Sequence, residues 1–263
     1  MAETGRKVDR QSLSLVCNER RFMTTIEEVS PAPVLEQRLV WDLPVRVFHW
    51  SLVAAIVGAF VTNKLGVAYF KYHVWFGYSV LVLVLFRIIW GFVGTHHAKF
   101  RNFVCGPFAT LRYAVTLLRG REIRHTGHNP LGAWMVLGLL VTLGTQAGIG
   151  LFSNDEIFNA GPLYGYVSKE LSLQLTSLHR HLFYWIIGAV AVHIAAVAAH
   201  QLFDKANLVY AMFTGRKSLA SAAESGGISS SRTWLAVVLI VALSAGLAWV
   251  IRHAPVPVDG DSF

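Results

Sequence analysis

The stretch LHRHLFYWIIGAVAVH, residues 178–193, decides the fold, because two histidines bracket an otherwise apolar segment. His179 and His193 are fourteen residues apart. That spacing is close to four turns of α-helix, so both rings lie on one face, about 21 Å apart along the axis. Ionisable side chains inside a membrane are energetically costly and usually functional. The stretch therefore predicts a membrane-spanning helix that carries two functional imidazoles at different depths.

The composition agrees with a membrane location. Of the 263 residues, 54% are hydrophobic and only 14% are charged, whereas soluble domains carry about 25% charged residues. The net charge of +8 does not indicate nucleic-acid binding, because Lys and Arg cluster in particular connections between apolar runs. The two cysteines are too few for a disulfide framework or a zinc site. The sequence thus indicates an integral membrane protein surrounded by lipid.

Five apolar stretches approach the roughly 20 residues that cross a hydrocarbon core. Aromatic residues flank them, as is typical of membrane interfaces. We predict an all-α fold, a four-helix membrane bundle with a fifth C-terminal transmembrane helix. The predicted spans are Val45–Thr62, His73–Phe92, Leu131–Phe152, Leu178–Phe203 and Trp234–Ile251.

The distribution of basic residues predicts the orientation. Seventeen Lys and Arg residues fall in the N-terminal segment and in the second and fourth connections, and four fall on the opposite side. Basic connections remain in the cytoplasm. We therefore expect a multi-pass protein of the bacterial inner (cell) membrane with a cytoplasmic N-terminus and a periplasmic C-terminus.

The segments outside the spans also have expected roles. The first 37 residues contain no apolar signal-peptide core and are expected to form a disordered cytoplasmic tail, with either Met1 or Met23 as the true start. Phe108–Leu118 is expected to be a short interfacial helix. Residues 216–233, rich in Ser, Ala and Gly, are expected to be a flexible linker. The added helix then covers 234–252, and 253–263 form an external tail.

Two further histidines match those of the fourth span in depth. His49 lies near the cytoplasmic start of the first span, and His73 lies near the external start of the second. Because the fourth span runs inward, His73 pairs with His179, and His49 pairs with His193. Two axial imidazoles hold the iron of a b-type haem in electron-transfer proteins. The four histidines therefore predict two bis-histidine haem b groups stacked across the membrane, within a domain covering residues 38–215.

Other interpretations of the histidines stay open. Each of the four can instead be an interfacial side chain or a hydrogen-bonding group between helices. His181 points to nearly the opposite face from His179, whereas His200 shares the face of His193 and competes with it as the deeper ligand. We favour His193 on depth.

Two arginines and several polar residues complete the predicted site. Arg46 and Arg87 are candidate partners of haem propionates, because guanidinium binds carboxylate bidentately; the alternative is simple extension of both side chains to the interface. A quinone needs an apolar slot with a few polar groups. The candidates on the cytoplasmic side are His96, His97, Lys99 and His128.

At this point the motifs resemble those of a known family. VWDLPVRVFHW (residues 40–50), HVWFGY (73–78), followed by FR (86–87) and WG (90–91), and GHNPLG (127–132) are similar to segments of the bacterial cytochrome b561 family. That family is related to the b-type cytochrome subunits of nickel–iron hydrogenases. The resemblance covers about residues 38–215 and implies a four-helix dihaem core with the same four histidines as iron ligands.

The resemblance also implies a function. Such proteins transfer electrons between the quinone pool and a partner redox protein, here a periplasmic c-type cytochrome or an oxidoreductase subunit. The first alternative is a membrane-anchor subunit of a larger enzyme, such as a nickel–iron hydrogenase. The second is a haem-free transporter or sensor that uses its intramembrane histidines. A homodimer is also considered, no catalytic residue is assigned, and any quinone oxidoreductase turnover is expected to be shared with a partner.

Overall fold

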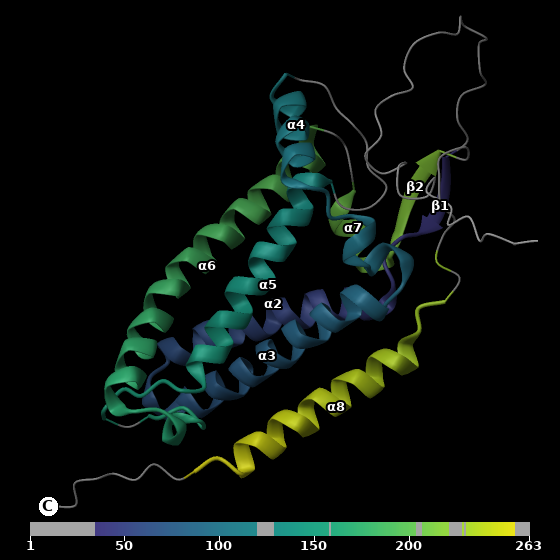
Figure 1. Ribbon diagram of the computed structural model, residues 1–263. Coiled ribbons are helices and arrows are strands. Elements are labelled where there is room, and N and C mark those ends of the chain that lie inside the picture. The colour runs from purple at the N-terminus through teal and green to yellow at the C-terminus, as the bar shows by residue number, and fades with distance from the viewer. Residues whose placement is uncertain are drawn as a thin grey trace, which may run out of the picture.

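The structure is a computed structural model that describes residues 35–119, 129–157, 159–203, 207–220, 228 and 230–255. Five long helices form most of the described chain (Figure 1). They are α2 (Leu43–Lys64), α3 (Phe70–Val93), α5 (Pro130–Gly150), α6 (Lys169–Phe203) and α8 (Thr233–Arg252). All five are long and apolar enough to cross a membrane. The predicted all-α membrane bundle is therefore confirmed.

Local sequence explains where two of these helices begin. Asp42 is the N-cap of α2, and its side chain accepts a hydrogen bond from the Val45 backbone N–H. Asn129 caps α5 in the same way through the Gly132 N–H. A proline follows each cap within the first turn, where its missing N–H costs nothing. Capping fixes the register of the side chains along the helix that follows.

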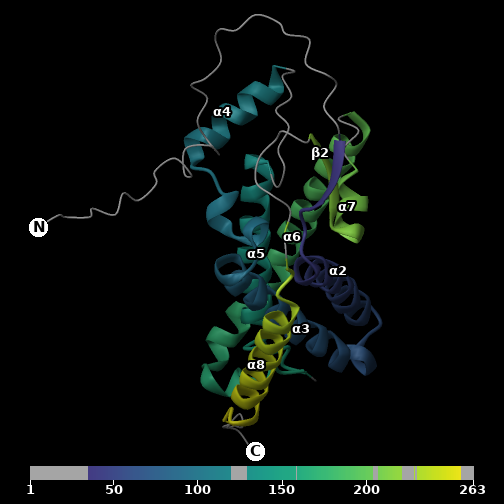
Figure 2. The ribbon, with the colours of Figure 1, turned by 90° about the vertical axis from the view of Figure 1, so that its right-hand side faces the viewer.

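The central helix of the bundle is α3. It packs against α2, α5 and α8, while α6 packs along α5 and does not pack closely along α2 or α3 (Figure 1). The buried core lies around α3, where Val84, Phe86 and Trp90 are at most 2% exposed. The helix α8 lies beside α3 on the side away from α6 (Figure 2). The backbone of α6 is therefore not close to α2 or α3, and only side chains span the space between them.

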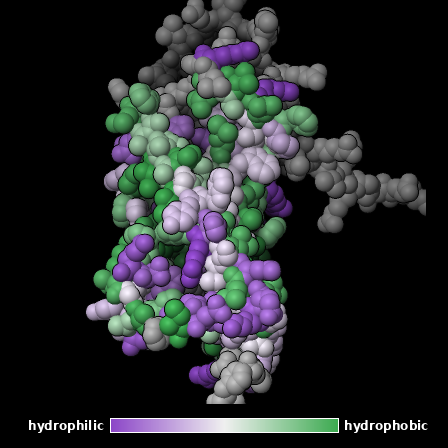
Figure 3. Space-filling view, turned by 90° about the vertical axis from the view of Figure 1, so that its left-hand side faces the viewer, coloured by the Kyte–Doolittle hydropathy of each residue, from purple (hydrophilic) through white to green (hydrophobic). Residues whose placement is uncertain are grey.

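Each of the five spans predicted from the sequence corresponds to one helix. The largest difference is at α6, which begins at Lys169, nine residues before the predicted span, and continues to Phe203. At 35 residues, α6 is longer than a membrane requires. Figure 3 shows the side of the molecule on which α6 lies. Hydrophobic side chains cover much of it, and hydrophilic side chains gather toward the bottom of the view, near the start of α6.

Two short strands differ from the prediction. Strand β1 (Leu35–Leu39) pairs antiparallel with β2 (Arg216–Ala220), with Arg38 opposite Lys217. The predicted N-terminal tail ended at residue 37 and the predicted linker began at residue 216, so β1 overlaps the end of that tail and β2 lies at the start of that linker. The pairing joins segments far apart in the chain, and nothing in either short polar stretch encodes its distant partner. The rest of the predicted tail, 1–34, and much of the linker lie outside the described residues.

The smaller helices lie at the same end as the strands. The predicted interfacial helix is present as α4 (Pro107–Leu118), and α7 (Leu208–Thr214) follows α6. Three-residue 3₁₀ turns occur at Val67–Tyr69 (η1), His96–Ala98 (η2), Phe100–Asn102 (η3) and Tyr164–Tyr166 (η4). We call the end with β1, β2 and α7 the strand end. The opposite end, with the connection 151–168 between α5 and α6, is the loop end.

Candidate functional site

His73 on α3 and His179 on α6 face each other at the loop end. Their ring centroids are 6.2 Å apart, and the ring planes are nearly perpendicular at 83°. The Nδ1 atom of His73 lies 2.9 Å from the Ala59 carbonyl oxygen, and that of His179 lies 3.0 Å from the Gln146 carbonyl oxygen. A carbonyl only accepts, so each Nδ1 donates. In the neutral form of each ring this leaves Nε2 as the unprotonated nitrogen, the form of imidazole that binds a metal.

The spacing of this pair suits two imidazoles on one metal ion. Metal–imidazole bonds are about 2 Å long, so two rings joined through one ion have centroids roughly 6 Å apart. The hydrogen bond from Nδ1 to a backbone carbonyl is the usual way in which a protein orients a ligating histidine. Gln146 strengthens the arrangement, because its side-chain Nε2 donates to the His179 carbonyl oxygen at 3.0 Å. These residues therefore fit the axial ligands of a haem.

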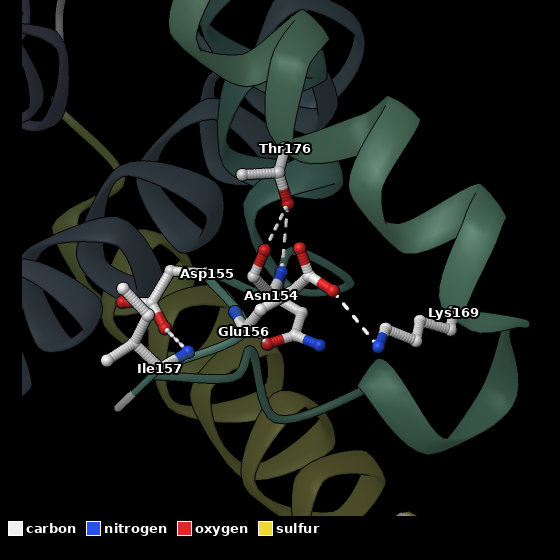
Figure 4. Close-up of polar contacts among 6 residues, drawn as sticks. All are labelled: Asn154, Asp155, Glu156, Ile157, Lys169 and Thr176. Carbon is white, nitrogen blue, oxygen red and sulfur yellow. Dashed lines mark hydrogen bonds and ion pairs between the residues drawn. The ribbon is translucent and has the colours of Figure 1, made fainter.

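The connection 151–168 is braced against the start of α6 beside this pair (Figure 4). Thr176 Oγ1 accepts from the Asn154 N–H at 2.9 Å and donates to the Asn154 carbonyl at 3.0 Å. Lys169 Nζ forms an ion pair with Glu156 Oε1 at 3.0 Å. Thr176 is three residues before His179 on α6. These contacts therefore hold Asn154 and Glu156 of the connection against the part of α6 that leads to His179.

His49 on α2 and His193 on α6 lie toward the strand end, and both rings are partly buried. The buried Nδ1 of His49 has no hydrogen-bond partner among the described residues. Phe60 of α2 stacks on Phe183 of α6, one helical turn after His179, with centroids 5.6 Å apart. The structure thus brings His73 and His179 into contact. The pairing of His49 with His193 and the binding of iron stay predictions.

Other buried donors near His49 also lack partners within the described part of the chain. They are Arg46 Nε, Trp50 Nε1 and Arg87 Nη1. Such orphaned donors are rare inside proteins, because each loses its hydrogen bonds with water. A ligand with carboxylates would satisfy all three, and the two propionates of a haem are such groups.

The two arginines are held in different ways. Arg46 Nη1 donates to the Phe213 carbonyl of α7 at 2.5 Å, and the Phe213 ring stacks on Trp50 with centroids 4.3 Å apart. Arg87 is 2% exposed, and its guanidinium lies 4.9 Å from the centre of the Phe100 ring. The alternative of a side chain extended to the interface does not describe Arg87, because a guanidinium buried this deeply does not reach water.

Asp42 holds parts of the site together, a role that was not expected from the sequence. It is 1% exposed and accepts three hydrogen bonds, from the Val45 N–H at 2.7 Å, Trp90 Nε1 at 3.0 Å and Thr95 Oγ1 at 2.5 Å. The carboxylate joins the start of α2 to the end of α3, seven residues before His49. An Asp directly before a Leu-Pro helix start was the available signal.

The competing histidines have other contacts. His200 Nε2 lies 3.1 Å from Asn129 Nδ2 at the start of α5. The exposed His181 uses Nδ1 to donate to the Ser177 carbonyl of its own helix at 2.8 Å. The structure therefore gives no geometric reason to replace His193 or His179 with either residue.

The polar residues proposed for a quinone are only partly gathered. His96 and His97 stack edge to face in η2 with ring centroids 5.1 Å apart. Burial lowers the pKa of His97, His96 lowers it further, and Asp42 partly opposes the shift. A nearby apolar cavity of about 450 Å³ lies between α3, α5 and η3, and Arg101 is its charged lining residue. Neither histidine nor Lys99 lines it, and His128 lies outside the described residues.

The fold and the paired histidines together define a class of protein. Five apolar helices form the bundle, and His73 and His179 between α3 and α6 have the spacing of two imidazoles on one metal ion. Each of these rings directs Nδ1 to a backbone carbonyl, as metal-binding histidines do. These features are those of a membrane b-type cytochrome, in which a porphyrin would supply the remaining iron ligands.

Comparison with known proteins identifies the family. Residues 40–215 match the family model described as prokaryotic cytochrome b561, and the chain belongs to that family. It is 26% identical over 212 residues to a probable Ni/Fe-hydrogenase B-type cytochrome subunit of Rhizobium leguminosarum bv. viciae, covering 68% of this chain and 87% of the relative.

Two further relatives carry similar names. The probable Ni/Fe-hydrogenase B-type cytochrome subunit of Rhodobacter capsulatus is 27% identical over 68% of this chain and 80% of its own. The corresponding hydrogenase 1 subunit of Escherichia coli (strain K12) is 23% identical over 68% and 90%. No solved structure matches significantly. The chain is therefore a multi-pass bacterial membrane b-type cytochrome, and haem b is the cofactor that its family implies.

Proposed function

We propose that the protein binds two haem b groups and transfers electrons across the membrane between the quinone pool and a partner redox protein. His73 and His179 bind one iron at the loop end, and His49 and His193 bind the second at the strand end. The observation that carries the proposal is the loop-end pair, with a centroid separation of 6.2 Å and both Nδ1 protons directed to carbonyls. A bound haem supplies reversible one-electron chemistry.

The residues of this chain have separate tasks in the proposal. Arg46, Arg87 and Trp50 offer buried donors to the propionates of the strand-end haem. Asp42 holds α2 and α3 in register so that these donors and His49 stay together. Ala59 and Gln146 orient the loop-end imidazoles through their carbonyls. The apolar core around Phe86 and Trp90 excludes water, which tunes the reduction potential.

The orientation that we propose for the protein in the membrane follows from the charge distribution of the sequence. We place the strand end in the cytoplasm, the loop end and C-terminus in the periplasm, and the partner at the loop end. Quinone reacts at the strand end, where the apolar cavity beside Phe100 and Arg101 lies near His96 and His97. The partner is a periplasmic c-type cytochrome or an oxidoreductase subunit.

The relatives support a second candidate function. Their names describe cytochrome subunits of nickel–iron hydrogenases. In that case this chain anchors a larger oxidoreductase and receives its electrons. Purification of this chain from native membranes, with an affinity tag on this chain alone, distinguishes the two functions. A stable complex with a metalloenzyme supports the anchor, whereas a free cytochrome reduced by a soluble carrier supports the first proposal.

A glycine pair on α5 tests the loop-end ligands. A Cβ at Gly150 would lie 3.0 Å from Cε1 of His179, whereas a Cβ at Gly148 has no neighbour within 4 Å. We expect Gly150→Ala to displace the His179 ring and change the electron paramagnetic resonance signal of one haem. Gly148→Ala should leave both signals unchanged. Identical spectra for the two variants would contradict the assignment of His179.

A further inference from the structure

A cleft separates α8 from the rest of the bundle. It has a volume of about 550 Å³ and lies between α8 on one side and α2 and α3 on the other. The family match ends at residue 215, so α8, which forms one wall of the cleft, lies outside the matched region. The polar and small residues that line the cleft are Tyr78 and Ser79 of α3, Ser51 of α2, and Ser244, Ala248 and Arg252 of α8.

Contacts at both ends hold α8 against the bundle. At the strand end, Arg232 Nη1 donates to the Val93 carbonyl at 3.1 Å, and Ala236 is buried against the core. At the loop end, the Tyr166 hydroxyl lies 3.5 Å from the His253 carbonyl. The cleft opens between these contacts along the loop-end half of α8, so a ligand enters there without moving either end.

Two hydroxyls of the cleft have no hydrogen-bond partner within the described part of the chain. They are those of Tyr78 and Ser244, whereas Ser79 donates to the Trp75 carbonyl at 3.0 Å. Arg252 lies at the mouth, at the end of α8, and forms no ion pair within the described part of the chain. Hydroxyls that face hydrocarbon without a partner are unfavourable. A ligand with oxygen acceptors and a negative charge would satisfy all three residues.

The cleft faces away from the histidines. Tyr78 follows His73 by five residues on α3, which rotates it by about 140° around the helix axis. Ser51 follows His49 by two residues, a rotation of about 160° in the other sense. A ligand in the cleft is therefore separated from the histidine pairs by the α2–α3 layer. This placement favours a lipid that fills a packing gap over a redox substrate.

We propose that the cleft binds one anionic phospholipid from the leaflet at the loop end. Its phosphate pairs with Arg252, its ester carbonyls accept hydrogen bonds from Tyr78 and Ser244, and an acyl chain lies along the apolar lining toward Ser51. Ser244 is eight residues before Arg252, about 12 Å deeper by backbone rise, and the long Arg252 side chain can span part of that distance, because helical side chains lean toward the N-terminal end. The lipid completes the packing of α8 against α3.

Native mass spectrometry of the purified full chain, titrated with phosphatidylglycerol, tests the proposal. We expect one tightly retained phosphatidylglycerol per chain. Arg252→Gln should weaken its binding roughly tenfold, the loss of one charge-assisted contact, and Ala248→Trp should abolish it by filling the cleft. Lys71→Gln removes a charge outside the cleft at the same end, and Ala245→Trp enlarges a residue of α8 outside the lining. Both controls should bind as the wild type does.

The possible results are distinct. Equal weakening by Arg252→Gln and Lys71→Gln would show a general charge effect and overturn the proposal. Equal affinity for phosphatidylethanolamine, whose net charge is zero, would also overturn it, as would retention of a quinone in place of a phospholipid. The readout does not depend on haem, so the outcome is independent of the proposed electron transfer. Size-exclusion chromatography of each variant confirms that it is folded before titration.

Discussion

Replacing Asp42 provides a strong test of how the strand end is built. Its carboxylate is 1% exposed and accepts hydrogen bonds from the Val45 N–H, Trp90 Nε1 and Thr95 Oγ1. Asp42→Ala removes the α2 N-cap and leaves two buried donors without an acceptor. Asp42→Asn keeps an oxygen for the Val45 N–H but presents an amide donor to the other two groups.

The magnitude follows from these contacts. Loss of an N-cap costs about 1 kcal/mol, and each buried donor left unsatisfied costs about 1–3 kcal/mol. We therefore expect Asp42→Ala to lower the free energy of unfolding by about 3–7 kcal/mol, a large part of the ~5–15 kcal/mol that stabilises a typical protein. Asp42→Asn should lower it by about 2–6 kcal/mol, because the N-cap is kept while Trp90 and Thr95 lose their acceptor.

Unfolding by sodium dodecyl sulfate in mixed micelles measures both changes in free energy. The variants should rank as wild type, then Asp42→Asn, then Asp42→Ala. Thr95→Val, made alone and together with Asp42→Ala, gives the coupling energy of the contact between Asp42 and Thr95, which should exceed about 0.5 kcal/mol. An Asp42→Ala protein within about 1 kcal/mol of wild type would refute the reasoning, since Ala lacks any acceptor.

Two further predictions concern packing and pH. A Cβ at Gly58 would lie 2.6 Å from the Phe76 ring, so Gly58→Ala should lower the free energy of unfolding by about 1–3 kcal/mol. Gly77→Ala, with no neighbour within 4 Å, should not lower it; equal losses would contradict the α2–α3 contact. Burial first, and then His96, lowers the pKa of His97 below its ordinary 6.5. The unfolded chain therefore binds the proton more readily than the folded chain does. As a result, neutral His97 favours the folded state above pH 6.5, and this contribution to stability is lost as the pH falls toward the folded pKa. The melting temperature of His97→Gln, measured from about pH 7.5 to 5.5, should fall less than that of wild type; parallel curves would exclude His97 as a cause.

The helices and the position of each histidine along them could be predicted from the sequence. Hydrophobic runs long enough to span a membrane are a one-dimensional signal, and helix geometry converts the spacing of His179 and His193 directly into depth and facing. The same geometry places His73 opposite His179, as the structure shows. The pairing of His49 with His193, the orientation and the binding of iron stay predictions.

Other parts of the site depend on contacts between segments that are distant in the chain. The pairing of β1 with β2 and the stacking of Trp50 on Phe213 are such contacts. Gln146 orients His179 mainly through a backbone carbonyl, a group that every residue has and that no sequence pattern distinguishes. Asp42 did have a local signal as a helix cap, but its bonds to Trp90 and Thr95 join two helices and appear only in three dimensions.

The most direct test of the central claim is a reduced-minus-oxidised absorption spectrum of the purified protein with haem quantification. The measurement is repeated on His49→Ala and His179→Ala, one variant for each proposed pair. We predict about two haem b groups per wild-type chain and the loss of one in each variant. A single haem in the wild type would contradict the pairing by depth. A protein without haem would contradict the account and support the transporter or sensor.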